Sequence, residues 1–75
     1  MNAADKFSSW LGSYSMQRLV YHTGFLMRDR LGDAEVEKLG RLAWAAKARG
    51  KVLLIQRRVA EGVYEYRAVK RRRGL

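Results

Sequence analysis

Apolar residues at the start of the chain recur at the spacing of a helix. They are Ala3, Ala4, Phe7, Trp10 and Leu11, separated as the residues of one helix face are. Asn2 is a suitable N-cap and Gly12 a suitable stop, so the pattern predicts a helix over residues 3–11. Three turns of helix are marginal alone in water, so Phe7 and Trp10 must dock on something, and a second subunit is one candidate.

The segment that follows favours a strand. Its strand formers are Val20, Tyr21, Thr23 and Phe25. Apolar residues occupy both parities, as in a strand that is covered on both sides. We expect a strand over residues 18–27, with a bulge or a close backbone approach at Gly24.

The clearest helical pattern covers residues 33–49. Asp33 is a natural N-cap, and Gly50 is the residue expected after the last turn. Acidic residues in the first turn and basic residues in the last turn complement the helix dipole. One apolar stripe consists of Val36, Leu39, Leu42, Ala43 and Ala46. Trp44 lies off this stripe, so it either covers the margin of the stripe or belongs to an interface.

The last third of the chain predicts a β-hairpin. Residues 51–58 and 63–70 read as strands on either side of a turn at Gly62. A two- or four-residue turn would place Arg58 opposite Glu65, a favourable cross-strand pair. The core face would then carry Leu53, Ile55, Val59, Tyr64, Tyr66 and Ala68. A three-residue loop would shift the register and place Arg57 opposite Glu65 instead.

These elements predict an α+β fold in one domain, residues 1–75, with residues 70–75 as a basic tail. The simplest arrangement is a three-stranded antiparallel sheet with one main helix packed on it, in the order β-α-β-β, plus the N-terminal helix. The alternative is a winged helix-turn-helix, with helix 33–49 as the recognition helix and the hairpin 51–70 as the wing. That alternative requires residues 23–31 to be helical.

The distribution of charge along the chain is the feature that bears most on function. The chain has 16 Lys and Arg residues against seven Asp and Glu residues, a net charge of +9. Residues 51–75 hold eight of the basic residues and two of the acidic ones, so most of the excess lies in the last third. Clustered basic charge is typical of a protein that binds a polyanion. The alternative is a charged surface that only keeps the protein soluble.

The sequence offers little for catalysis. It has no cysteine and a single histidine, His22, and it lacks a glycine-rich phosphate loop, an HExxH pattern and a nucleophile elbow. We therefore expect a non-catalytic protein without a metal or a cofactor. The first residues lack a basic leader followed by an apolar run, and no stretch is apolar enough to span a membrane, so a cytoplasmic location is expected.

The predicted function is binding of DNA or RNA through the basic C-terminal hairpin and tail. The predicted contacts are Lys47, Arg49, Lys51, Arg57, Arg58, Arg67, Lys70, Arg71, Arg72 and Arg73. A solvated sheet face would explain Arg57, Arg58 and Arg67 equally well. Small size without disulfides or metals favours a homodimer, for which Phe7, Trp10 and Trp44 are the predicted interface residues.

Two stretches, "VYHTGFLMRDR" and "GKVLLIQRRVAEGVYEYRAVKR", resemble a group of small proteins encoded by bacteriophages and prophages. The resemblance covers residues 19–71 and implies a phage gene product that acts inside a bacterium. It implies no catalytic residues. It also implies a second candidate function, a protein that binds and inhibits a host enzyme or defence complex through an acidic surface of that partner.

Overall fold

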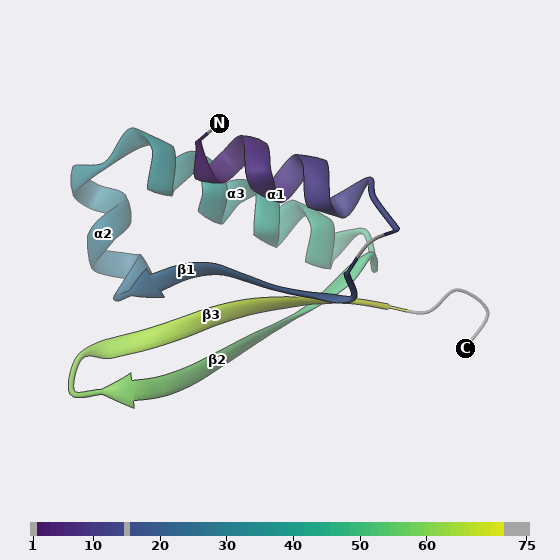
Figure 1. Ribbon diagram of the computed structural model, residues 1–75. Coiled ribbons are helices and arrows are strands. Elements are labelled where there is room, and N and C mark those ends of the chain that lie inside the picture. Colours follow the sequence, from purple (N-terminus) through teal and green to yellow (C-terminus); the bar gives the residue numbers. More distant parts are fainter. Residues whose placement is uncertain (1, 15, 72–75) are drawn as a thin grey trace.

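Two helices lie on one face of a three-stranded sheet, and a third, short helix stands at one end of that sheet (Figure 1). The computed structural model describes residues 2–14 and 16–71 of the 75-residue chain. In chain order the elements are α1 (Ala3–Leu11), β1 (Arg18–Gly24), α2 (Leu26–Gly32), α3 (Ala34–Ala48), β2 (Val52–Ala60) and β3 (Val63–Lys70). The predicted α+β class and the antiparallel three-stranded sheet are confirmed.

The sheet places the last strand in its centre. The strand order is β1-β3-β2, and β3 is antiparallel to both neighbours. The order α1-β1-α2-α3-β2-β3 contains a helix before α3 and a hairpin after it, which are the elements that the winged helix-turn-helix alternative requires. The junction of α2 and α3 departs from the usual three- to four-residue turn, because Asp33 alone separates the two helices.

Helix α1 docks on the rest of the same chain. The Asn2 side chain accepts a hydrogen bond from the Asp5 amide at 2.9 Å and caps the helix. Phe7 is 1% exposed and Trp10 is 7% exposed, and the Phe7 ring centroid lies 5.7 Å from those of Trp10 and Tyr21. The expected docking partner is therefore the chain's own core, which leaves neither Phe7 nor Trp10 accessible to a second subunit in this fold.

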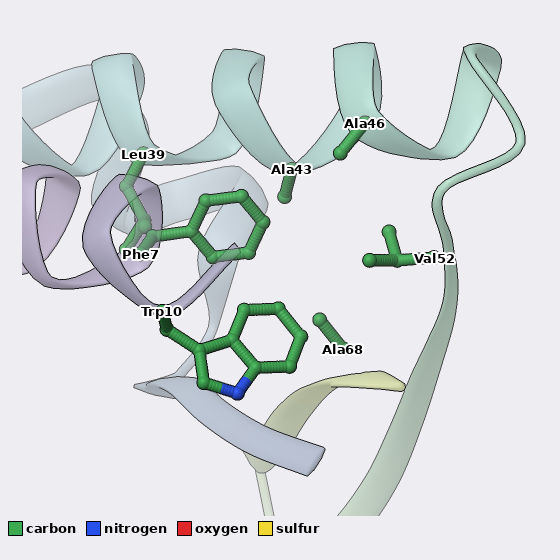
Figure 2. Close-up of a cluster of buried hydrophobic side chains, with 7 residues drawn as sticks. All are labelled: Phe7, Trp10, Leu39, Ala43, Ala46, Val52 and Ala68. Atoms are coloured by element: carbon green, nitrogen blue, oxygen red, sulfur yellow. The ribbon is translucent and has the colours of Figure 1, made fainter. Parts of the chain in front are cut away.

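Helix α3 brings small residues against the sheet. The Asp33 side chain accepts hydrogen bonds from the Glu35 and Val36 amides, as the N-cap prediction requires. Figure 2 shows the resulting cluster, in which helix residues face two strand residues: Phe7, Trp10, Leu39, Ala43, Ala46, Val52 and Ala68. Two alanines in the helix let α3 approach the strands closely, so a short chain obtains a dense core.

The predicted strand over residues 18–27 is too long, because a helix begins within it. Gly24 has a φ of 140°, and a Cβ there would lie 2.5 Å from Asp29 Oδ2. The Phe25 amide donates to that same Asp29 oxygen at 3.1 Å, and the Leu26 amide donates to the hydroxyl of Tyr66 at 3.0 Å. These contacts turn the chain out of the sheet and start α2, which meets most of the helical requirement of the winged alternative.

A β-bulge decides which side chains of the hairpin face the helices. The turn is the predicted two-residue one, since Ala60 pairs with Val63 and Gly62 has a φ of 70°. A bulge between Arg58 and Ala60 then shifts the register, so Arg57 lies opposite Glu65. The predicted core face is therefore right for Tyr66 and Ala68, which are buried, and wrong for Leu53, Ile55 and Val59, which are exposed.

Candidate nucleic-acid interface

Basic side chains from the ends of four elements gather at one end of the molecule. The order of the strands explains why: the C-terminus of central β3 lies between the N-termini of β1 and β2, and α3 leads directly into β2. The Lys70 amide donates to the Gln17 carbonyl at 2.8 Å, and the Arg71 amide donates to the Lys51 carbonyl at 3.0 Å. We call this set the basic end; its members are Arg18, Lys47, Arg49, Lys51, Lys70 and Arg71.

The cations of the basic end lack carboxylate partners. Within residues 2–14 and 16–71, none of them takes part in an ion pair, and all except Lys70 are exposed. The Lys70 amine donates to the Ser13 carbonyl and lies 4.7 Å from the centroid of the Trp10 ring, so Lys70 also fastens the segment after α1. The remaining cations are exposed and have no carboxylate partner among the described residues, and Lys47 alone of them lies over an aromatic ring, that of Trp44.

Three cations at the opposite end of the molecule, Arg28, Arg30 and Arg41, pair with carboxylates. This hairpin end consists of α2, the first two turns of α3 and the strand ends next to the hairpin turn. Glu37 accepts from Arg30 Nε at 2.9 Å and from Arg41 Nε at 2.8 Å, and these two guanidinium groups lower the pKa of Glu37 from 4.5 to about 2. At the end of β1, the hydrogen bond from His22 is the largest cause that lowers the pKa of Asp29, and Arg28 lowers it further.

The structure divides the predicted nucleic-acid contacts into three groups. Five of them belong to the basic end: Lys47, Arg49, Lys51, Lys70 and Arg71. Arg57 and Arg58 are exposed on β2 near the hairpin turn, and Arg67 donates to Glu65 at 2.7 Å on the same strand. Arg72 and Arg73 lie outside the described residues, as does most of the predicted tail, whereas Lys70 is the last residue of β3.

Arg18 belongs to the basic end but is missing from the predicted contacts. It is the first residue of β1 and pairs with Val69. Its position follows only from the central place of β3, since that arrangement brings the start of β1 beside the end of β3. The sequence shows only that a basic residue stands at the start of a predicted strand. Without the strand order, this position does not indicate that Arg18 lies beside the other cations.

An exposed aromatic ring adjoins the basic end. A hollow of about 410 Å³ is lined by Ser13, Tyr14, Met16, Gln17, Lys70 and Arg71. Tyr14 is fully exposed there. An aromatic ring next to phosphate-binding cations is the arrangement on which unpaired bases stack, so this hollow suits a nucleotide whose base is not held in a duplex.

A second hollow, the helix groove, separates α2 and α3 from the sheet. It has a volume of about 500 Å³, and its lining consists of Tyr21, Leu26, Arg30, Gly40, Arg41, Trp44, Ala45 and Leu54. Trp44, one of the predicted interface residues, is 63% exposed, and the Lys47 amine lies 4.5 Å from the centroid of its ring. The groove therefore offers a largely apolar surface with two aromatic side chains, Tyr21 and Trp44.

The His22 side chain of β1 and the Asp29 side chain of α2 are partners of each other. His22 Nε2 lies 2.8 Å from Asp29 Oδ2, and the His22 side chain is largely buried, so the pair ties the end of β1 to α2. In the part of the chain that the structure describes, no three His, Cys, Asp or Glu side chains form a group that could hold a metal ion. No helix among these same residues is long and apolar enough to cross a membrane.

Comparisons with known proteins find no relative. No protein-family model matches the chain, and neither a curated protein nor a solved structure matches it. The structure therefore defines the protein by its own features: a small α+β domain with a three-stranded antiparallel sheet and with different charge pairing at its two ends.

Proposed function

We propose that the protein is a non-catalytic nucleic-acid-binding protein that contacts the phosphate backbone with its basic end. The observation that carries the proposal is the gathering of unpaired cations from α3, β1, β2 and β3 at one end. Phosphate contacts of Lys and Arg supply most of the affinity of such proteins, because they release condensed counterions. The tail residues Arg72 and Arg73 follow Arg71 in the sequence and add to the same charge.

The hairpin end, which a winged helix-turn-helix would use, is the poorer candidate for phosphate contacts. Asp33, Glu35 and Glu37 lie at the start of α3, and these carboxylates would repel a phosphate backbone. Arg30 and Arg41 are also engaged by Glu37. The element order thus supports a nucleic-acid ligand as a class, while the charge favours contact at the end away from the wing.

Tyr14 favours single-stranded over duplex ligands within this proposal. Its exposed ring shares a hollow with Lys70 and Arg71. Base–aromatic stacking contributes about 1–3 kcal/mol per base to single-strand binding. A duplex keeps its bases stacked, so it could use the cations of the basic end but not the ring.

The resemblance to phage proteins and the expected cytoplasmic location complete the proposal: a phage-encoded protein that regulates or protects DNA or RNA inside a bacterium. A homodimer is also part of it, although its interface cannot include the buried Phe7 and Trp10. Trp44 on the rim of the helix groove favours a second candidate function, inhibition of a host protein, since Trp is common in interface hot spots.

The proposed function is tested by binding of random-sequence DNA and RNA, single-stranded and duplex, at several salt concentrations. If about four to six cations contact phosphates, affinity for duplex should fall by roughly a hundred- to a thousandfold between 50 and 200 mM salt. Replacing Arg71, Arg72 and Arg73 with alanine should make the salt slope shallower by up to about three units. If the protein binds none of these ligands at 50 mM salt, the proposal is overturned and inhibition of a host protein becomes the favoured function.

A further inference from the structure

The face of the sheet that turns away from the helices has an apolar surface that nothing in the chain covers. The register places three cross-strand rows on this open face: Arg18, Val69 and Leu53; Val20, Arg67 and Ile55; Thr23, Glu65 and Arg57. Both long helices lie on the opposite side of the sheet (Figure 1). Each of the first two rows therefore presents aliphatic side chains to the outside.

The exposure of these aliphatic residues is unusual for a one-sided sheet. An antiparallel sheet with one solvated face normally alternates apolar residues inward and polar residues outward. Here Val20 is 44% exposed, Leu53 52% and Ile55 47%. The strands carry apolar residues on both faces, which is the pattern of a sheet that is covered on both sides.

We propose that the open face binds the open face of a second copy of this chain. The central strand supports this occupant, because it carries Glu65 and Arg67 on the same face. A twofold axis that lies between the two sheets, perpendicular to the strands and midway between these residues, places each Arg67 opposite the Glu65 of the other copy. The in-chain contact uses one N–H group of Arg67, and its enclosed Nε has no hydrogen-bond partner among the described residues. A second carboxylate would meet the other terminal nitrogen of the guanidinium, Nη1, because Nε is enclosed and Nη2 already binds Glu65.

Charge selects the orientation of the two copies. With a net charge of +9 on each chain, two basic ends side by side would repel each other. The twofold axis perpendicular to the strands makes the strands of the two copies antiparallel and places each basic end beside the hairpin end of the other copy. Six of the seven acidic residues of the chain belong to the hairpin end: Asp29, Asp33, Glu35, Glu37, Glu61 and Glu65.

The size of the open face sets the strength of the dimer. Three strands of about eight residues cover a surface of roughly 26 by 14 Å, from the rise per residue and the strand spacing. That is about half of the roughly 800 Å² per partner that a stable complex buries. An interface of this size is typical of weak, transient complexes, so we expect a weak dimer.

Sedimentation equilibrium without nucleic acid tests the interface. The wild-type chain should pass from monomer to dimer between about 5 µM and 1 mM. Leu53→Lys should raise the dissociation constant at least tenfold, because it buries a charge in the interface. Leu31→Lys is the matched control: Leu31 lies on α2, is also exposed, and gains the same charge, so it should change the constant by less than about twofold.

The outcomes are separable from the proposed function. A wild-type monomer at every concentration would overturn the inference, and so would dimerisation that Leu53→Lys leaves unchanged. Loss of dimerisation in a Trp44→Lys variant but not in Leu53→Lys would assign the contact to the helix groove instead. Binding of single-stranded nucleic acid by monomeric Leu53→Lys would show that the basic end works whether or not the chain dimerises.

The orientation is tested by one spin label on each chain. The sequence has no cysteine, so Glu61→Cys at the hairpin turn gives a single labelling site. Antiparallel copies place the two turns at opposite ends of the dimer, at a separation comparable with the 37 Å long axis of one chain. A distance below about half that value would mean that the hairpin turns lie together, which would overturn the proposed orientation.

Discussion

The basic end and the hairpin end of the molecule carry similar numbers of cations but employ them differently. At the hairpin end Arg30 and Arg41 share Glu37, and Arg28 lies 3.5 Å from Asp29. At the basic end no described cation has a carboxylate partner. The number of basic residues in a segment therefore says less about function than whether the fold supplies each of them with an acidic neighbour.

This difference assigns separate tasks to the two ends. Glu37 links α2 to α3 through Arg30, so the charges of the hairpin end hold a short helix in place. The charges of the basic end hold little of the fold, apart from Lys70, and are exposed to solvent. Substitutions confined to one end should therefore affect either binding or stability, and not both.

The largest expected effect is on nucleic-acid affinity. Replacing Lys47, Lys51 and Arg71 with alanine should weaken binding about ten- to a hundredfold and reduce the salt slope by about two to three units, because three phosphate contacts are lost. The matched control removes three cations from the hairpin end, Arg28, Arg57 and Arg58. Titration of a labelled oligonucleotide should show that the affinity of the control changes by less than about threefold. An equal loss of affinity in both variants would show that the two ends do not differ in nucleic-acid binding.

A smaller effect is expected at the ring beside the basic end. Tyr14→Ala should weaken binding of single-stranded nucleic acid about fivefold or more, which corresponds to the lower limit of base stacking. Duplex affinity should stay unchanged, since a duplex offers no free base. Tyr14→Trp keeps an aromatic surface and should restore the single-strand affinity; an equal loss on both ligands would show that the ring only supports the surrounding loop.

At the hairpin end, a charge removal should affect stability rather than binding. Glu37→Gln removes the carboxylate that Arg30 and Arg41 share, so the midpoint of thermal unfolding should fall. Glu35→Gln is the control, because Glu35 also lies in the first turn of α3 but is exposed and makes no ion pair within the described chain. A fall of the same size in both variants would show that Glu37 stabilises the fold only through its interaction with the helix dipole, and not through Arg30 and Arg41.

The dependence of stability on pH should report the same carboxylate. The pKa of Glu37 is lowered from 4.5 to about 2 in the folded chain, so the folded state binds its proton less readily than the unfolded state does. Its contribution is complete above about pH 4.5 and is lost as the pH falls towards 2. Across this range the wild-type midpoint should fall more than that of Glu37→Gln, and parallel curves would contradict the assignment.

Local signals predicted most of the fold. Asp33, Gly50 and the apolar stripe of helix 33–49 were sufficient for α3, and Gly62 was sufficient for the hairpin turn. Helix α2 was missed because its start depends on distant residues: Tyr66 accepts a hydrogen bond from Leu26 across 40 positions of the chain. The seven residues of α2 are too few to produce a helical pattern that outweighs the strand formers before them.

The bulge and the charge groups were harder to predict. Nothing in the residues from Arg58 to Ala60 indicates the extra residue that shifts the register of the hairpin, and a shift of one residue exchanges the two faces of a strand. Most of the basic end was predicted, since Lys47, Arg49 and Lys51 follow one another closely and the C-terminal cations meet them across the hairpin. The place of Arg18 required the strand order, whereas Arg67 and Glu65 lie two residues apart on one strand and their pairing competed with the predicted cross-strand pair of Arg58 and Glu65.

The most direct test of the central claim locates the ligand on the protein. Amide chemical shifts of the isotope-labelled chain should be followed while a short random single-stranded oligonucleotide is added at low salt. The largest changes should fall on the basic end, at Arg18, at residues 47–51 and at residues 70–71, and on Tyr14 beside it. Changes concentrated in α2, in the first turns of α3 and in residues 57–63 would contradict the account, because they would place the polyanion at the hairpin end, where Arg28, Arg30 and Arg41 pair with carboxylates.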